Sequence, residues 1–201
     1  MKKDIIISGV GGQGILTISA VLDLAALENG YNIKQSEVHG MSQRGGAVQS
    51  HVRISDQPVY SDLIPKGKAD LILSVEPMEL LRYLSYLHSE GYLITDSNPF
   101  KNIPNYPNES ELKRQIASFP NHRIINAHSL AKKAGNLRAA NIVMIGAAAD
   151  LLPFEDDLLR KVIKDLFKSK GDRIVQMSGK TYVNNKVVSE AEVMAQIVKE
   201  K

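Results

Sequence analysis

The segment from Asp4 to Gly14 constrains the fold more than any other part of the sequence. Its first half, Asp4–Ser8, is a short β-branched run that is typical of a strand buried on both faces. The run leads directly into the turn GVGGQG, and apolar residues then recur at helical spacing up to Asn29. The sequence therefore predicts a strand, a tight turn and a helix, with backbone N–H groups and the positive end of the helix dipole facing the turn.

Strand and helix patterns alternate along the rest of the chain. They predict strands at 31–38, 48–54, 69–75, 91–95 and 123–127, and helices at 77–88, 109–118, 128–134, 139–152 and 156–168. We interpret residues 99–121, which contain four prolines, as a surface excursion. A hairpin is expected at 182–188, turning at Asn184-Asn185, and a last helix at 190–199.

This alternation favours an α/β fold: a single Rossmann-like domain over residues 1–201, with three α/β/α layers around a mainly parallel sheet. The third strand and the C-terminal hairpin are expected as antiparallel additions.

Composition excludes several classes of function. The chain contains no cysteine, so it supplies no thiolate nucleophile, zinc–thiolate site or iron–sulfur ligand. Its net charge of +3 is too small to indicate a nucleic-acid-binding surface. No apolar run approaches the roughly 18 to 20 residues of a membrane span, and we recognise no export segment. We expect a cytoplasmic protein without nucleic-acid or membrane partners.

The glycine turn has two interpretations. It matches the G-x-G-x-x-G pattern of dinucleotide-binding folds through Gly9, Gly11 and Gly14, with Gly12 as a further glycine. Such a site also needs an acidic residue at the end of the second strand, where Glu37 is placed to bind a ribose hydroxyl. The glycines equally suit a tight crossover that packs against protein. Gln13 leaves the choice open, because its side chain can bind a phosphate or reach back into the following loop.

A second glycine-rich segment, SEVHGMSQRGGAV at residues 36–48, follows the second predicted strand. The carboxyl ends of strands are where α/β folds bind ligands, and its candidate binding residues are His39, Gln43, Arg44, Gly45 and Gly46. Arg44 is suited to a bidentate contact with a phosphate or carboxylate, and Arg53 is a second candidate cation. The alternative is a flexible connector with a solvated arginine.

Other polar residues carry weaker signals. No acidic residue or histidine accompanies His39 and His51 at metal-ligand spacing, so we predict no metal site. His39 is interpreted as a hydrogen-bonding loop residue, with acid–base chemistry as the alternative. Glu76 and Asp96 follow predicted strands, where binding residues gather, but a helix start and a turn explain them equally well.

The two glycine-rich motifs together resemble the gamma-type domain of the 2-oxoacid:ferredoxin oxidoreductases. The resemblance rests on residues 9–14 and 37–46 and extends through 51–53, 69–70 and 76–77. The sequence HGMSQRGG within the second motif favours the indolepyruvate or aryl-pyruvate branch of this family.

This resemblance implies a subunit that is not catalytic alone. In the family, a larger partner binds thiamine diphosphate and iron–sulfur clusters, decarboxylates the 2-oxoacid and passes electrons to ferredoxin, while the acyl group goes to coenzyme A. The gamma-type domain is expected to pack on that partner, with its glycine turn and the 43–46 loop shaping the coenzyme A side. The alternatives are a stand-alone NAD-dependent dehydrogenase or regulatory domain that uses Glu37, and a purely structural subunit.

Overall fold

The computed structural model describes four segments of the chain, namely residues 1–40, 45–169, 174–183 and 186–196. Contacts divide the chain into two compact units, Met1–Asp156 and Asp157–Lys201. That the whole of 1–201 forms one domain stays a prediction. No helix in the described segments is long and apolar enough to cross a membrane.

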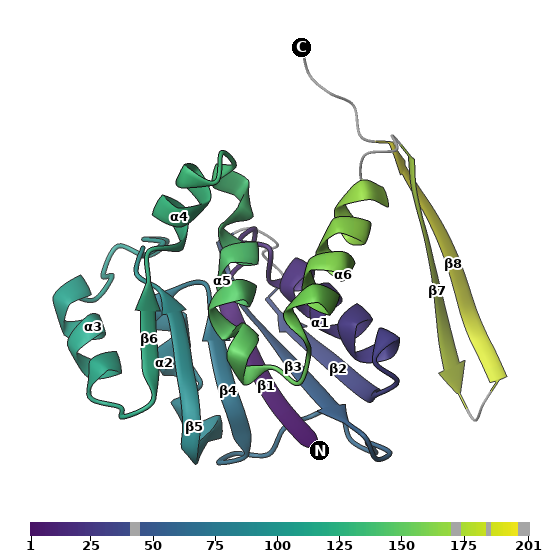
Figure 1. Ribbon diagram of the computed structural model, residues 1–201, viewed down its shortest axis with the longest axis horizontal. Helices are drawn as coiled ribbons and strands as arrows, with labels where there is room; N and C mark the ends of the chain where they lie inside the picture. Colours follow the sequence, from purple (N-terminus) through teal and green to yellow (C-terminus); the bar gives the residue numbers. More distant parts are fainter. Residues whose placement is uncertain (41–44, 170–173, 184–185, 197–201) are drawn as a thin grey trace. The chain divides into compact units, whose positions relative to one another are not determined.

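A six-stranded mixed sheet forms the centre of the first unit (Figure 1). Its strands are β1 (Lys2–Val10), β2 (Asn32–His39), β3 (Ala47–Ser55), β4 (Ala69–Ser74), β5 (Leu87–Asp96) and β6 (His122–Ile125), in the order β2-β3-β1-β4-β5-β6. β4 pairs with β1 and β5 in parallel, and β6 pairs in parallel with β5. β3 is antiparallel to both β1 and β2. β2 and β3 lie on one side of β1, and β4, β5 and β6 lie on the other. The carboxyl edge between β1 and β4 is therefore a topological switch point.

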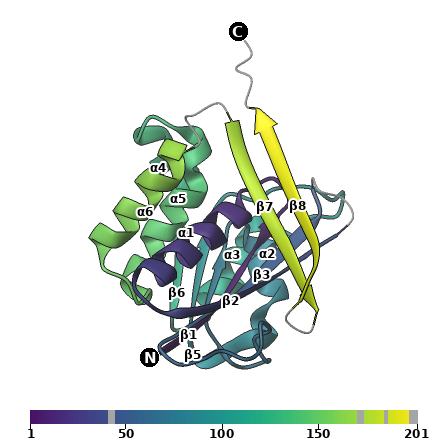
Figure 2. The same ribbon diagram turned by 90° about the vertical axis from the view of Figure 1, so that its right-hand side faces the viewer.

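Helices cover both faces of this sheet. On one face α1 (Ile15–Glu28) contacts β1, β2 and β3, α5 (Ala140–Ala148) contacts α1, β4 and β5, and α4 (Ala127–Lys133) packs on α5. On the other face α2 (Pro77–Arg82) contacts β1, β4 and β5, and α3 (Glu109–Ala117) contacts α2 and β6. Figure 2 shows these two groups on opposite sides of the strands. The predicted three-layer α/β/α fold is confirmed.

The apolar run of β1 has a direct physical reason. Ile5, Ile6 and Ile7 are fully buried, although successive side chains of a strand point to opposite faces. With helices on both faces, each of these side chains enters a core, which is why the strand is continuously apolar rather than alternating.

The structure corrects two predicted helices. The helix expected at 77–88 ends at Arg82, and a short 3₁₀ turn, Leu84–Tyr86, leads into β5, where Leu87 pairs with Ala69. The helix expected at 190–199 is wrong: β8 (Lys186–Gln196) pairs antiparallel with β7 (Ile174–Val183), and this pairing takes up the backbone groups of β8 that face β7. Helix α6 (Asp156–Ser169) forms as expected.

The third strand and the hairpin both pair antiparallel, as expected. β3 lies inside the sheet, between β2 and β1. The hairpin is a separate two-stranded sheet that is longer than predicted, and its predicted turn at 184–185 lies outside the described residues.

Candidate functional site

The outer glycines of the turn serve close packing. A Cβ added to Gly9 would lie 2.4 Å from Cγ2 of Val75, and one added to Gly14 would lie 2.4 Å from Nδ2 of Asn141. Gly14 also has a φ of 81°, a left-handed conformation that starts α1, and its carbonyl accepts a hydrogen bond from Asn141 Nδ2 at 3.3 Å. These two glycines therefore let β4 and α5 approach the turn.

The middle of the turn faces open space. Gly12 has a φ of 101° and is exposed, and an added Cβ would have no atom within 4 Å. Gln13 points back into the protein: its Oε1 accepts the Val10 N–H at 2.7 Å, and its Nε2 lies 3.4 Å from the Val75 carbonyl oxygen. Of the two interpretations of Gln13, the structure shows the internal hydrogen bonds, which leave the Gly12 backbone as the approachable part of the turn.

The second glycine-rich segment pairs with this turn through its backbone. Gly11 N–H donates to the Gly46 carbonyl at 2.8 Å, and Gly45 N–H donates to the Gly11 carbonyl at 3.3 Å. Gly45 has a φ of 80°. Gln43 and Arg44 lie outside the described residues. The structure thus brings the glycine turn together with the end of the second motif that the sequence analysis singled out.

A cleft of about 480 Å³ opens on one side of the turn, and we call it the His39 cleft. Its lining residues are Gly11, Gly12, Gly14, Ile15, Leu16, Thr17, His39 and Val48. His39 is the last residue of β2 rather than a loop residue; its side chain is exposed, and its Nδ1 lies 3.2 Å from the Gly40 carbonyl oxygen.

A second cleft, of about 540 Å³, lies at the switch point on the other side of Gly12, and we call it the Asp96 cleft. Asp96 is buried at the end of β5, and its Oδ2 lies 2.9 Å from Nδ1 of His128. Its Oδ1 accepts the Ala127 N–H at 3.2 Å and Nδ2 of Asn98 at 2.9 Å. Sequence analysis gave Asp96 a minor place and missed His128, which follows β6 at the same edge.

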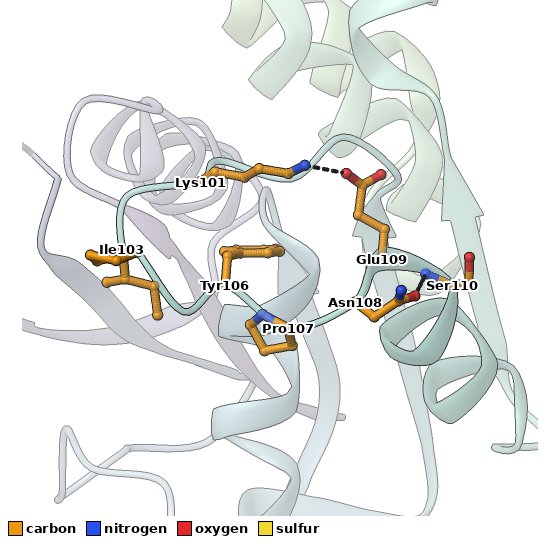
Figure 3. A pocket seen from close by; sticks show the side chains of 8 residues that line it. Lys101, Ile103, Tyr106, Pro107, Asn108, Glu109 and Ser110 are labelled. Carbon is orange, nitrogen blue, oxygen red and sulfur yellow. Dashed lines mark hydrogen bonds and ion pairs between the residues drawn. The ribbon is translucent and has the colours of Figure 1, made fainter.

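A third group of residues near the turn was also missed. They belong to residues 97–108, which we call the strap. Asn102 donates from Nδ2 to the Gly45 carbonyl at 2.7 Å, and the Tyr106 hydroxyl donates to Oε1 of Glu76. Figure 3 shows Tyr106 inside the curve of the strap, with Lys101 reaching across to Glu109. The Lys101 Nζ and Glu109 Oε1 atoms are 2.8 Å apart. The strap therefore connects to the site, although its sequence indicated only a surface excursion.

Glu76 has a structural role. It is fully buried, and its Oε2 accepts the Glu79 N–H at 2.8 Å as the N-cap of α2. Burial, together with the hydrogen bond to the Glu76 carboxylate, raises the pKa of the Tyr106 hydroxyl well above its usual range. That hydroxyl is therefore a permanent donor to Glu76.

Two predicted residues lie away from the site. Arg53 pairs with Asp4 near the start of β1, at 2.9 Å, and donates to the carbonyls of Ser61 and Leu63. Along β1 that position is six residues from Val10, or about 20 Å at 3.3 Å per residue. The suggested phosphate contact of Arg53 is wrong. His51 is buried in β3, where its Nδ1 accepts the Ile64 N–H at 3.0 Å.

The position of β2 argues against the dinucleotide alternative. Because β3 lies between β2 and β1, Glu37 is two strands from the glycine turn, about 10 Å across, instead of one. Its Oε1 accepts from Gln35 Nε2 at 3.2 Å. Burial raises the pKa of Asp23 to about 6, and the Glu37 carboxylate adds to the shift. Glu37 thus faces another acid on α1 and is not placed to bind a ribose beside the turn.

Comparison of the sequence with known proteins shows the family of this chain. Residues 4–182 match the family model described as pyruvate ferredoxin/flavodoxin oxidoreductase. The chain belongs to this family. It is 42% identical over 175 residues to the indolepyruvate oxidoreductase subunit IorB of Pyrococcus horikoshii, covering 82% of this chain and 86% of the relative.

Solved structures show the same fold. The gamma subunit of a keto/oxoacid ferredoxin oxidoreductase from Geobacter sulfurreducens is 27% identical, with a TM-score of 0.60 over 81% of this chain and 85% of that one. A 2-oxoglutarate:ferredoxin oxidoreductase from Magnetococcus marinus, solved with coenzyme A, has a TM-score of 0.64 at 19% identity, and the match covers 85% of this chain and 28% of that one. The prediction of an oxidoreductase subunit of this family is confirmed.

Proposed function

We propose that this chain is the small, non-catalytic subunit of a coenzyme A-dependent indolepyruvate:ferredoxin oxidoreductase. Two observations support the substrate class. The relative from Pyrococcus horikoshii, at 42% identity, is named an indolepyruvate oxidoreductase subunit. The segment His39–Gly46 also has the form that resembles the indolepyruvate or aryl-pyruvate branch.

Within the complex, this chain contributes to the coenzyme A side of the shared site. The observation that carries this proposal is the backbone pairing of Gly11 with Gly45 and Gly46, which joins the second glycine-rich segment to the turn that exposes Gly12. Backbone N–H groups at such a turn and a guanidinium are both suited to phosphate oxygens. Arg44, with Gln43 beside it in the chain, would bind the phosphates of coenzyme A, and His39 would line the adjacent cleft.

The remaining cofactors belong to a partner in this proposal. The 201 residues contain no cysteine, and cysteine thiolates hold most iron–sulfur clusters. We assign the clusters, thiamine diphosphate and the electron transfer to ferredoxin to a larger catalytic subunit on which this chain packs. The cytoplasmic location inferred from the sequence stays a prediction.

Replacing Arg44 tests the coenzyme A contact. In the complex assembled with Arg44→Ala, we expect KM for coenzyme A to rise by about tenfold or more, because a charge-assisted contact contributes roughly 1.5 to 3 kcal/mol. The measurement is steady-state oxidation of indolepyruvate at varied coenzyme A. Arg114→Ala is the matched control, since Arg114 is exposed on α3 and pairs with Glu111. An unchanged KM and unchanged affinity for the partner in Arg44→Ala would remove the proposed role.

A further inference from the structure

The strap forms hydrogen bonds both to Glu76, at the beginning of α2, and to Gly45 in the second glycine-rich segment. Glu76 holds it through two contacts to Oε1, from the Tyr106 hydroxyl and from the Phe100 N–H at 3.4 Å. Between these two contacts along the chain, Asn102 donates to the Gly45 carbonyl at 2.7 Å. Because Glu76 is fully buried and caps α2, the strap is fixed to an element that packs on the central sheet.

Gly45 is the residue at which the second segment meets the glycine turn. Its N–H donates to Gly11, its carbonyl accepts from Asn102, and the next residue, Gly46, accepts from Gly11. Glycine has access to more backbone conformations than any other residue, and Gly45 adopts a left-handed one, with a φ of 80°. Hydrogen bonds to Gly45 are therefore needed to hold its backbone in this one conformation. The bond from Asn102 holds the carbonyl of the Gly45–Gly46 peptide, and the peptide's orientation depends on it.

We propose that Asn102 is a positioning residue that fixes the Gly45–Gly46 peptide against the glycine turn, so that the exposed backbone of Gly12 is held in place for a phosphate-bearing cosubstrate. This inference rests on the proposed function, because it takes the phosphate-bearing cosubstrate to be coenzyme A. Asn102 acts through Gly45 and does not touch the cosubstrate. Glu76 supports Asn102 by binding the strap on both sides of it, at Phe100 and at Tyr106.

The chain offers a closely matched pair of variants. Asn102→Asp keeps the shape of the side chain but replaces the amide donor with a carboxylate oxygen, which repels the Gly45 carbonyl. Asn105→Asp makes the same chemical change at an exposed position of the same strap. The two variants carry the same added charge, so a difference between them does not come from net charge and reports the surroundings of Asn102, where Nδ2 contacts Gly45 and Oδ1 is buried.

The first readout is amide hydrogen exchange of the full chain without coenzyme A or partner. Asn102→Asp should speed exchange of the Gly11 and Gly45 N–H groups by about tenfold, the factor that corresponds to losing one ordinary hydrogen bond. Exchange in β1 and β4 should stay as in wild type, which shows that the fold is intact. Equal exchange of Gly11 and Gly45 in wild type and Asn102→Asp would overturn the proposal, whatever coenzyme A does.

The second readout is the assembled complex. Asn102→Asp should raise KM for coenzyme A by about tenfold with kcat within twofold of wild type, and Asn105→Asp should change neither. If Arg44→Ala raises KM but Asn102→Asp does not, the positioning role of Asn102 is overturned and the proposed function stands. If neither variant changes KM for coenzyme A, the proposed coenzyme A contact itself fails.

Discussion

At the scale of single residues, Gly9 is where the glycine turn packs most tightly. In Gly9→Ala the new Cβ would lie 2.4 Å from Val75 Cγ2, so the turn and β4 must separate. Overpacking of this kind costs about 1 to 3 kcal/mol. We expect the free energy of unfolding in urea to fall by that amount.

Replacing Gly146 by alanine is expected to have the opposite effect on stability. Gly146 lies in α5, is exposed, and an added Cβ would meet no atom within 4 Å. Gly146→Ala should therefore stabilise the protein by about 0.4 to 1 kcal/mol.

If Gly9→Ala is as stable as wild type, Gly9 does not serve the packing described above.

At the scale of elements, His51 attaches the connection between β3 and β4 to the sheet by accepting the Ile64 N–H. Burial lowers the pKa of His51 below its usual 6.5, and Arg53 lowers it further against a smaller opposing effect of Asp4. The folded protein therefore keeps His51 neutral at pH values where the unfolded chain binds a proton. This contribution to stability is complete above about pH 6.5 and is lost as the pH falls below it.

His51→Asn removes the titration and keeps an acceptor atom at the position of Nδ1. We expect the variant to be less stable than wild type at about pH 7.5, and the gap to narrow by about pH 5. Urea unfolding of both proteins across this pH range measures the difference in their free energies of unfolding. The other histidines are the same in both proteins, so their contributions cancel in this difference. Parallel pH profiles for the two proteins would show that His51 is not held neutral by the fold.

Elements also show how far the sequence predicts this structure. The β1–turn–α1 unit was predictable because the Ile5–Ile7 run, the glycines and the helical spacing are local signals. The position of β3 inside the sheet could not be predicted, because strand order depends on pairing between strands that are distant in the sequence. Asn102 lies 57 residues from Gly45, and Asn141 lies 127 residues from Gly14. Nothing in the local pattern around either asparagine indicates these contacts.

At the scale of the whole molecule, the central sheet of the first unit has a carboxyl edge that is shaped from both faces of the sheet. The glycine turn follows β1, and α5 contacts it through Asn141. The strap contacts Gly45 through Asn102, and Gly45 in turn pairs with Gly11 of the turn. The backbone of Gly12 is left exposed between two clefts. This arrangement suits a surface that completes a site shared with another chain, and Glu37 is not placed to help bind a dinucleotide.

The most direct test of that account is reconstitution of the complex from this chain and the large subunit of the native source. Indolepyruvate oxidation is measured with ferredoxin and coenzyme A for each chain alone and for the mixture, alongside NAD binding by this chain alone. We predict coenzyme A-dependent oxidation by the mixture only, and no NAD binding. Stoichiometric NAD binding by the isolated chain, or full activity of the large subunit without it, would contradict the account.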